Sequence, residues 1–170
     1  MQPTHTHNNG GKPASPPADH ILEVRGLKTH FTLNEGLVKA IDGVDFTVKR
    51  GQTLGIVGES GCGKSVTAHS ILQLVEKPGR IVGGQILFHP ANSETIDLAT
   101  QGEWDDTMIN VRWNQIAMIF QEPMNSLSPV HTIGNQIIEA IRLHESISVE
   151  AARKRSVDLL GLVGIPAPAD

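Results

Sequence analysis

A glycine-rich segment at residues 58–65 constrains the fold of this 170-residue chain more than any other feature. It fits the pattern G-x-x-x-x-G-K-[ST]. With the position that follows, it comprises Gly58, Glu59, Ser60, Gly61, Cys62, Gly63, Lys64, Ser65 and Val66. An apolar run at 54–57 precedes the segment, and a helix pattern follows it at 66–72. This order predicts a strand, a loop and a helix, which is the context that the pattern requires.

The residue types of this loop suit a polyphosphate group. Glycines let successive backbone N–H groups turn inward, and the helix predicted to start near Lys64 places its positive end at the same point. Lys64 can bridge the β- and γ-phosphate oxygens of a nucleotide, and the Ser65 hydroxyl can ligate Mg²⁺. The alternative is a glycine-rich turn that only caps a strand–helix unit. The strand and helix patterns on either side favour nucleotide binding.

Composition and charge exclude several other classes of protein. The net charge of −4 argues against binding nucleic acid by bulk electrostatics. The longest apolar runs are far too short to span a bilayer, and residues 1–20 lack the apolar core of a secretory signal. A single cysteine excludes an internal disulfide and suits a reducing compartment. We therefore expect a cytoplasmic chain whose link to a membrane comes through a partner.

The amino-acid composition of the chain changes at residue 20. Residues 1–19 are rich in Pro, His, Asn, Gly and Ser, which predicts a disordered tail. His5 and His7 could chelate a metal weakly, but a solvated tail is favoured because no third ligand lies nearby. Residues 20–52 predict an antiparallel β layer. Its expected strands are 21–25, 27–33, 37–41 and 44–48, with a turn at 34–36 and a hairpin at Asp42-Gly43.

Residues 53–122 predict an α/β core around the loop. The helix after the loop has an apolar face of Ala68, Ile71, Leu72 and Val75 and is expected to end at Pro78-Gly79. A strand at 85–88, a surface loop at 91–102 and a short helix at 103–112 follow in the prediction. The apolar run 116–120 predicts a strand buried on both faces. Gln121 would then lie at its carboxyl end, where open α/β sheets place ligand-binding groups.

Residues 123–170 predict two further helices. Ile133, Ile137, Ile138 and Ile141 line one face of the first helix. The apolar positions of the second helix are Val149, Ala152, Leu159, Leu160 and Val163.

The order of these features resembles the ATP-binding subunits of ABC transporters. The resemblance covers residues 20–170 and implies a P-loop nucleoside triphosphate hydrolase fold of ABC type: an antiparallel β layer, a P-loop core and the start of a helical subdomain. Three stretches are similar to the oligopeptide/dipeptide importer ATPases, at 40–44, 119–129 and 160–165. The second is the most specific, because it runs Ile-Phe-Gln-Glu-Pro-Met-Asn-Ser-Leu-Ser-Pro.

The resemblance implies roles for several residues. Gln121 would be the Q-loop glutamine, which touches Mg²⁺ or the attacking water and reports the nucleotide state to the membrane subunits. The alternative is a strand-terminal glutamine that bonds to backbone. Phe31 would stack on the adenine of ATP, with an ordinary core phenylalanine as the alternative. Residues 123–129 would face the transmembrane partner, and alkylation of an exposed Cys62 is expected to block ATP binding.

The family pattern is incomplete within these 170 residues. No LSGGQ-like signature, no second acidic strand ending in Asp-Glu (the Walker B strand) and no switch histidine follows the second helix. Phosphoryl transfer to water needs a metal held by that Asp and a group that orients the nucleophile. We therefore expect an incomplete domain that binds ATP but does not hydrolyse it alone. Uncovered apolar surface at 54–57 and 116–120 should leave it marginally stable.

Several functions remain open at this point. The favoured one is a subunit that couples ATP hydrolysis to peptide uptake, bound to permease subunits at the inner face of the cell inner membrane. It would pair head-to-tail with a second ATP-binding subunit. Importers of nickel or glutathione have a similar sequence at the positions of residues 121–129. A non-catalytic regulatory module is an alternative, whereas a small kinase or GTPase is disfavoured because no NKxD-like motif is present.

Overall fold

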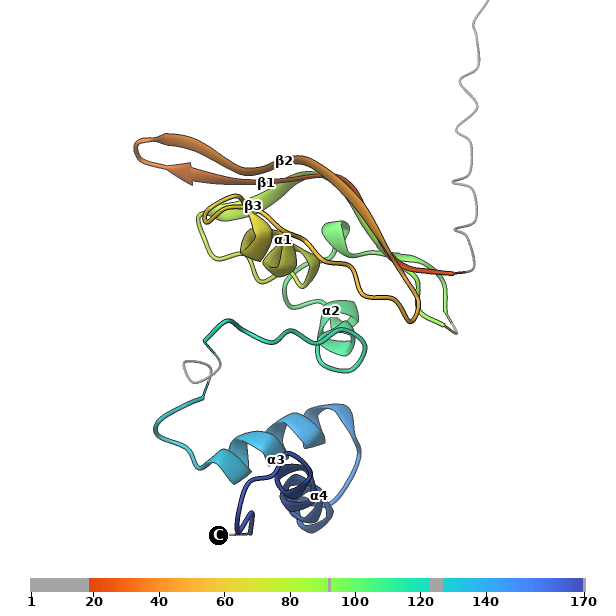
Figure 1. Cartoon of the computed structure of the whole chain (residues 1–170), viewed down its shortest axis with the longest axis vertical. Coiled ribbons are helices and arrows are strands. Elements are labelled where there is room, and N and C mark those ends of the chain that lie inside the picture. The colour runs from red at the N-terminus through yellow and green to blue at the C-terminus, as the bar shows by residue number, and fades with distance from the viewer. Residues whose placement is uncertain (1–18, 92, 123–126, 170) are drawn as a thin grey trace, which may run out of the picture. The chain divides into compact units, whose positions relative to one another are not determined.

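The computed structural model describes residues 19–91, 93–122 and 127–169 (Figure 1). The predicted tail, apart from Asp19, and residues 123–126 of the expected partner-facing segment lie outside the described residues. The chain divides into two compact units, a first unit of residues 1–103 and a second unit of residues 104–170.

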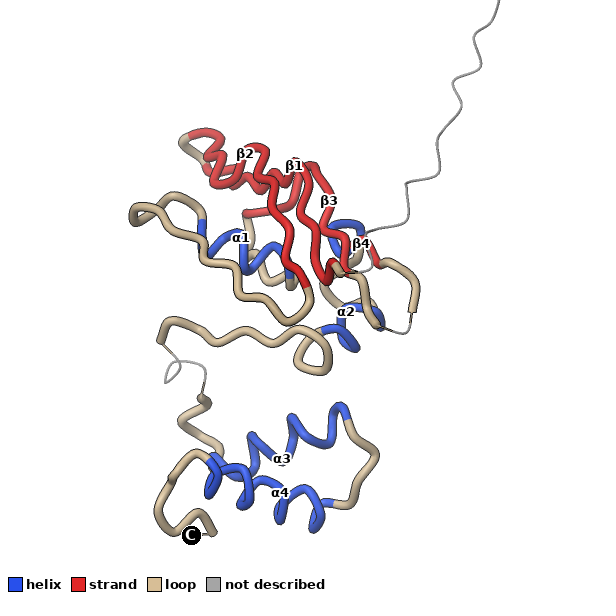
Figure 2. Tube along the Cα trace, turned by 45° about the vertical axis from the view of Figure 1, so that its right-hand side comes forward, coloured by secondary structure: helices blue, strands red, loops and turns tan. Residues whose placement is uncertain are grey.

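The first unit is an antiparallel sheet with a short α-helix and a 3-10 helix. Its elements are β1 (His20–Leu33), β2 (Gly36–Lys49), α1 (Lys64–Ile71), β3 (Gly79–Phe88), β4 (Ile96–Asp97) and the 3-10 helix η1 (Leu98–Thr100). The strand order is β2-β1-β3-β4, and every pair is antiparallel. Helix α1 contacts β1, β2 and η1 (Figure 2). The buried apolar side chains of this unit are Val24, Leu27, Ile41, Leu72, Ile86, Phe88 and Leu98. The expected antiparallel layer is thus confirmed.

The predicted hairpin at Asp42-Gly43 is wrong. Strand β2 runs straight through this dipeptide. The turn that joins β1 to β2 lies at residues 34–35, within the turn predicted at 34–36. Gly43 has a φ of 95° where the register between the two strands shifts, so it forms a bulge. The two strands expected at 21–33 form one strand, which is also irregular at Gly26 (φ 53°). The Gly26 amide there donates to Asp45 Oδ1 at 2.7 Å.

The two strands expected to form the parallel core are absent from the described structure. Residues 54–57 have no strand pairing, and Val57 is 92% exposed. Residues 116–120 make one isolated parallel bridge, between Arg112 and Ile116, and Ile119 is 93% exposed. A strand is held by hydrogen bonds to a neighbouring strand. Neither segment has such a neighbour among the described residues, so high β propensity alone does not form the strand.

Helix α1 and the segment after it also differ from expectation. The helix begins at Lys64 as predicted but ends at Ile71, well before Pro78. Its end is closed by the Leu74 amide, which donates to the His69 carbonyl at 2.8 Å, and Gln73 adopts a left-handed conformation with φ 53°. The strand expected at 85–88 extends back to Gly79.

The polar stretch 91–102 is more ordered than a surface loop. It contains β4 and η1, and Leu98 is fully buried. The Asp97 carboxylate accepts from the amides of Ala99 and Ile86, both at 3.0 Å. This side chain therefore caps η1 and ties it to β3.

The second unit is helical. It contains α2 (Asp106–Val111), α3 (Ile133–His144) and α4 (Val149–Leu162), which confirms the three predicted helices. Thr132 and Ser148 cap α3 and α4 by accepting from the third amide of each helix. Helices α3 and α4 pack on each other. In the described part of the chain, no helix has the length and apolarity needed to cross a membrane.

Candidate functional site

The glycine-rich loop has the backbone that its sequence predicts. Gly61 and Gly63 have φ values of 81° and 94°, in the left-handed region that favours glycine. Gly63 is the N-cap of α1, and a Cβ added to it would lie 2.5 Å from the Ala40 carbonyl oxygen of β2. The backbone of the loop can approach β2 this closely only because residue 63 has no side chain.

The first turn of α1 presents backbone amides at the end of this loop. The first bond within the helix runs from the Thr67 amide to the Gly63 carbonyl at 2.8 Å, and the Thr67 hydroxyl donates to the same oxygen at 2.9 Å. The amides of Lys64, Ser65 and Val66 precede that bond and have no carbonyl one turn earlier in the helix. No acidic residue lies in this first turn. These amides, at the positive end of the helix, fit an anion.

The Lys64 side chain folds back over the loop. Its Nζ donates to the carbonyl oxygens of Gly58 at 2.8 Å and Glu59 at 2.7 Å. Nζ also lies 3.4 Å from the sulfur of Cys62, which is a free and exposed cysteine. The Ser65 hydroxyl is exposed at the start of the helix. The loop therefore gathers one ammonium, one exposed hydroxyl and the open amides of α1, as polyphosphate binding requires.

Phe31 and Val66 line the same pocket. The pocket has a volume of about 250 Å³, and its lining comprises Phe31, Val66, His69, Leu74, Val75 and Glu76. Phe31 pairs with Gly79 across the sheet, and a Cβ on Gly79 would lie 2.5 Å from the phenyl ring. The structure thus brings Phe31 of β1 against the flank of the loop helix. The sequence reasoning missed His69, although the i,i+3 spacing from Val66 on a helix places both on one face.

Gln121 lies in the second unit and is exposed. It does not end a strand, so the predicted strand-terminal position is wrong, and its role toward a nucleotide stays a prediction. Ser128 is tied to α3 by Gln136, whose side chain accepts from the Ser128 amide at 2.9 Å and donates to the Ser128 carbonyl at 3.0 Å. Sequence reasoning gave no role to Gln136, since a polar residue on an amphipathic helix carries no distinguishing signal.

No group of three or more His, Cys, Asp or Glu side chains within the described ranges is placed to hold a metal ion. The residues expected from the sequence to contact a metal ion are Ser65 and Gln121, and their role stays a prediction.

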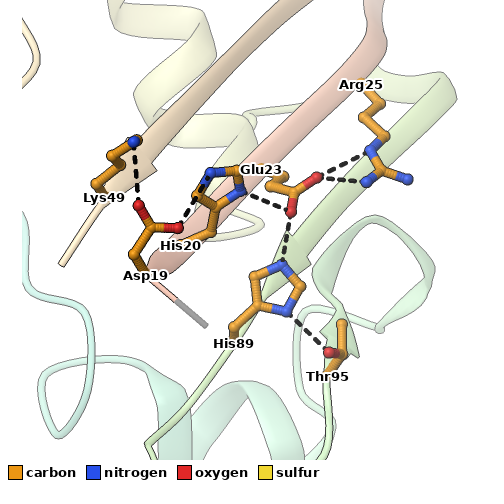
Figure 3. Close-up of polar contacts among 7 residues, drawn as sticks. All are labelled: Asp19, His20, Glu23, Arg25, Lys49, His89 and Thr95. Carbon is orange, nitrogen blue, oxygen red and sulfur yellow. Dashed lines mark hydrogen bonds and ion pairs between the residues drawn. The ribbon is translucent and has the colours of Figure 1, made fainter. Parts of the chain in front are cut away.

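A second polar cluster joins the ends of three strands in the first unit. Figure 3 shows the Glu23 carboxylate between the side chains of His20, Arg25 and His89. His20 Nδ1 lies 3.0 Å from Glu23 Oε1, Arg25 Nε donates to Oε2 at 3.1 Å, and His89 Nε2 lies 3.4 Å from Oε1. The other ring nitrogen of His89 lies 2.8 Å from the Thr95 hydroxyl. Glu23 and His89 are both buried, so this cluster stabilises the sheet rather than facing a ligand.

Burial and pairing shift the pKa values in this cluster. Burial alone would raise the pKa of the Glu23 carboxyl, but the hydrogen bonds from His20 and Arg25 outweigh it and hold that pKa below its ordinary value. Burial lowers the pKa of the His89 imidazole, against the opposing attraction of Glu23. The folded protein therefore favours an ionised Glu23 and a neutral His89.

The sheet, the glycine-rich loop and the helix that follows it define a P-loop nucleoside triphosphate hydrolase fold. Two solved structures share it, both of one bacterial ABC transporter cassette. The dimeric form has a TM-score of 0.67 at 22% identity and covers 84% of this chain and 56% of that one. A form in a post-hydrolysis state, bound to ADP and Pi, has a TM-score of 0.65 at 19% identity.

Residues 41–167 match the ABC transporter family, and the chain belongs to that family. A probable peptide ABC transporter ATP-binding protein of Sinorhizobium fredii is 49% identical over 156 residues, which are 91% of this chain and 44% of that protein. The oligopeptide transport ATP-binding protein OppD of Bacillus subtilis is 50% identical over 149 residues, which are 87% and 40%. The chain spans less than half the length of these relatives.

Proposed function

We propose that this chain belongs to the ATP-binding subunit of an importer that couples ATP binding and hydrolysis to the uptake of peptides. The observation that carries this proposal is the loop at 58–65, where Lys64 and the open amides of α1 converge. The names of the relatives support a peptide substrate. A glutathione import ATP-binding protein of Pectobacterium atrosepticum is 42% identical over 151 residues, so glutathione is the second candidate.

The residues of the chain have distinct roles in this proposal. The amides of the loop and of the first turn of α1 would hold the phosphates. Lys64 would give up its hydrogen bonds to the carbonyls of Gly58 and Glu59 and donate to phosphate oxygens. The Ser65 hydroxyl would hold Mg²⁺, which would neutralise phosphate charge, and Gln121 is the second residue that the family resemblance assigns to the metal. Phe31 and Val66 would contact the adenine base. An aromatic ring and a pocket beside the loop helix support ATP as the ligand.

We further propose that these 170 residues bind ATP without hydrolysing it. They contain no signature motif, Walker B strand or switch histidine. Permease subunits and a second ATP-binding subunit, arranged head-to-tail, would be the partners, at the cytoplasmic face of the inner membrane. A non-catalytic regulatory module is the alternative. ATPase activity of the pure chain with Mg²⁺ would contradict both the inactive-chain proposal and that alternative.

Binding of a fluorescent ATP analogue in the presence of Mg²⁺ tests the proposed site. Because Lys64 supplies a charge-assisted contact, Lys64→Ala should weaken affinity by about tenfold or more. Lys154→Ala is the matched control, since Lys154 is an exposed lysine of α4 and should leave the affinity unchanged. Equal binding by Lys64→Ala and the parent protein would remove the foundation of the proposal.

Alkylation of Cys62 is an independent probe of the same loop. Its sulfur lies 3.4 Å from Lys64 Nζ, and a Cβ on Gly58 would lie only 2.6 Å from it. A group added to this sulfur should therefore crowd the loop and block the analogue. A Cys62→Ser variant treated with the same reagent is the control and should keep its affinity. Unchanged binding by the alkylated parent protein would contradict this account of the loop.

A further inference from the structure

A buried pair of hydroxyl groups connects β1 to the loop helix. Thr29 Oγ1 of β1 and Ser70 Oγ of α1 lie 2.8 Å apart, and both residues are fully buried at 0% exposure. Ser70 Oγ also donates to the carbonyl oxygen of Val66 at 2.7 Å. A serine hydroxyl has one proton, so Thr29 must be the donor to Ser70. The hydrogen bonds thus run in one direction, from Thr29 through Ser70 to Val66.

This chain of bonds ends in the first turn of α1, which carries the open amides. Val66 contributes one of those amides, and its carbonyl oxygen accepts the hydrogen bond from the Ser70 hydroxyl. The position of Thr29 on β1 therefore determines where the first turn of α1 lies, and this turn faces the phosphate loop. Burial without a partner is costly for a hydroxyl, so neither group can easily give up its bond.

The buried side chains of helix α1 are polar rather than apolar. It is eight residues long, and its only buried residues are Thr67 and Ser70, which both carry hydroxyls. Apolar burial is non-directional and tolerates sliding of one element along another, whereas a hydrogen bond fixes distance and angle. The helix is anchored beyond its two ends by the close approach of Gly63 to β2 and by Gln73 Nε2, which donates to the Leu98 carbonyl at 2.7 Å. Between these two points, the Ser70 hydroxyl makes a buried hydrogen bond to β1.

We infer that Thr29 and Ser70 are positioning residues for the phosphate loop. They touch no ligand. They set the place of α1 along β1 so that its open amides and the Lys64 ammonium face the same point. This inference rests on the proposed nucleotide binding and assigns to it two residues outside the loop pattern.

Thr29→Val is the central variant, because valine keeps the shape and β branching of threonine and removes only the hydroxyl. Affinity for the fluorescent ATP analogue should fall by about fivefold in Thr29→Val and by about tenfold in Ser70→Ala. The larger loss of affinity is expected for Ser70→Ala because it leaves the buried Thr29 hydroxyl without an acceptor. Thr29→Ser keeps the hydroxyl and should bind within about twofold of the parent protein.

Thr95→Val is the control for the same substitution away from α1, at an exposed threonine where the loss of stability should be smaller than at the buried Thr29. It is the same chemical change, and it removes the hydrogen bond to His89 without touching α1. Thr95→Val should lower the Tm while leaving the affinity unchanged. The inference is overturned if Thr29→Val binds as well as the parent protein. It is also overturned if Thr95→Val weakens binding as much as Thr29→Val does. Should Thr29→Val fail to fold, Ser70→Ala breaks the same bond and decides the question by the same criteria.

Hydrogen exchange without nucleotide separates this inference from the proposed function. The amides of residues 67–71 should exchange about fivefold faster in Thr29→Val than in the parent protein, and those of β3 should not change. If the parent protein binds no nucleotide, the proposed function fails while this measurement still tests the positioning. Unchanged exchange in α1 overturns the inference even where nucleotide binds.

Discussion

The antiparallel sheet and the segments 54–57 and 116–120 are built from the same kinds of residue, yet only the sheet forms. Leu27 and Ile86, in neighbouring paired strands, are completely buried. Val57 and Ile119 are more than nine-tenths exposed. The difference does not lie in apolar content or β branching. It lies in whether a second strand supplies hydrogen bonds and a covering face, which a pattern within one segment cannot reveal.

Substitution by alanine in both regions gives the largest expected effect. Leu27→Ala should lower the free energy of unfolding by about 3 kcal/mol, because it leaves a cavity in the core of the sheet. Val57→Ala should change it by less than about 0.5 kcal/mol, since the side chain is exposed. Urea denaturation followed by circular dichroism measures both. A cost for Val57→Ala near that of Leu27→Ala would break the comparison, since it would show that 54–57 is paired in solution.

The phosphate loop sharpens the comparison, because it follows the unpaired segment 54–57 and yet is fixed to the sheet at Gly63. Gly63→Ala should lower the free energy of unfolding by about 2 kcal/mol, from left-handed strain together with the clash with the Ala40 carbonyl. Gly61→Ala is the control. Gly61 has a similar φ but nothing within 4 Å of an added Cβ, so its cost should be about 1 kcal/mol. Equal costs from thermal unfolding would show that the contact with β2 contributes nothing.

The sequence predicted the features that local chemistry decides. The loop glycines, the start of α1 at Lys64 and the helices α3 and α4 follow from patterns within a few residues. The Asp42-Gly43 dipeptide was misassigned because the same glycine conformation serves a hairpin turn and a bulge. The Thr29–Ser70 bond joins residues 41 positions apart, so no local pattern contains it.

The Glu23 cluster makes the stability of the sheet depend on pH. The folded-state pKa values of Glu23 and His89 are both below their ordinary values, so the unfolded chain binds more protons in both cases. The free energy of unfolding should therefore decrease as pH falls, first below about 6.5 for the histidine and again below about 4.3 for the glutamate. Segment 54–57 contains no titratable group and should add nothing to this response.

Glu23→Gln isolates the carboxylate in this response. At pH 7 it should cost roughly 1–2 kcal/mol, because the hydrogen bonds to a charged group are lost. It should also shrink the acid limb near pH 4, to which the lowered pKa values of Asp19 and Asp42 still contribute. The limb near pH 6 should remain, because loss of the Glu23 charge removes an interaction that raises the pKa of His89. Urea denaturation from pH 4 to pH 8 measures both limbs, with the exposed Glu94→Gln as control. A variant that keeps the parent's full pH profile would show that Glu23 is not the titrating group.

The smallest effect concerns the turn at which 116–120 makes its single bridge. Trp113 has a φ of 65°, a left-handed conformation that is strained for a bulky residue, and its amide donates to the Ile116 carbonyl at 2.9 Å. Trp113→Gly should raise the free energy of unfolding by about 0.5–1 kcal/mol, because relief of strain outweighs the added freedom of the unfolded chain. Trp104→Gly is the control: Trp104 is also exposed but has no positive φ, so glycine there should destabilise. If both glycine substitutions destabilise the protein alike, the turn is unstrained in solution. The lack of a longer strand at 116–120 would then follow from the absence of a partner strand alone.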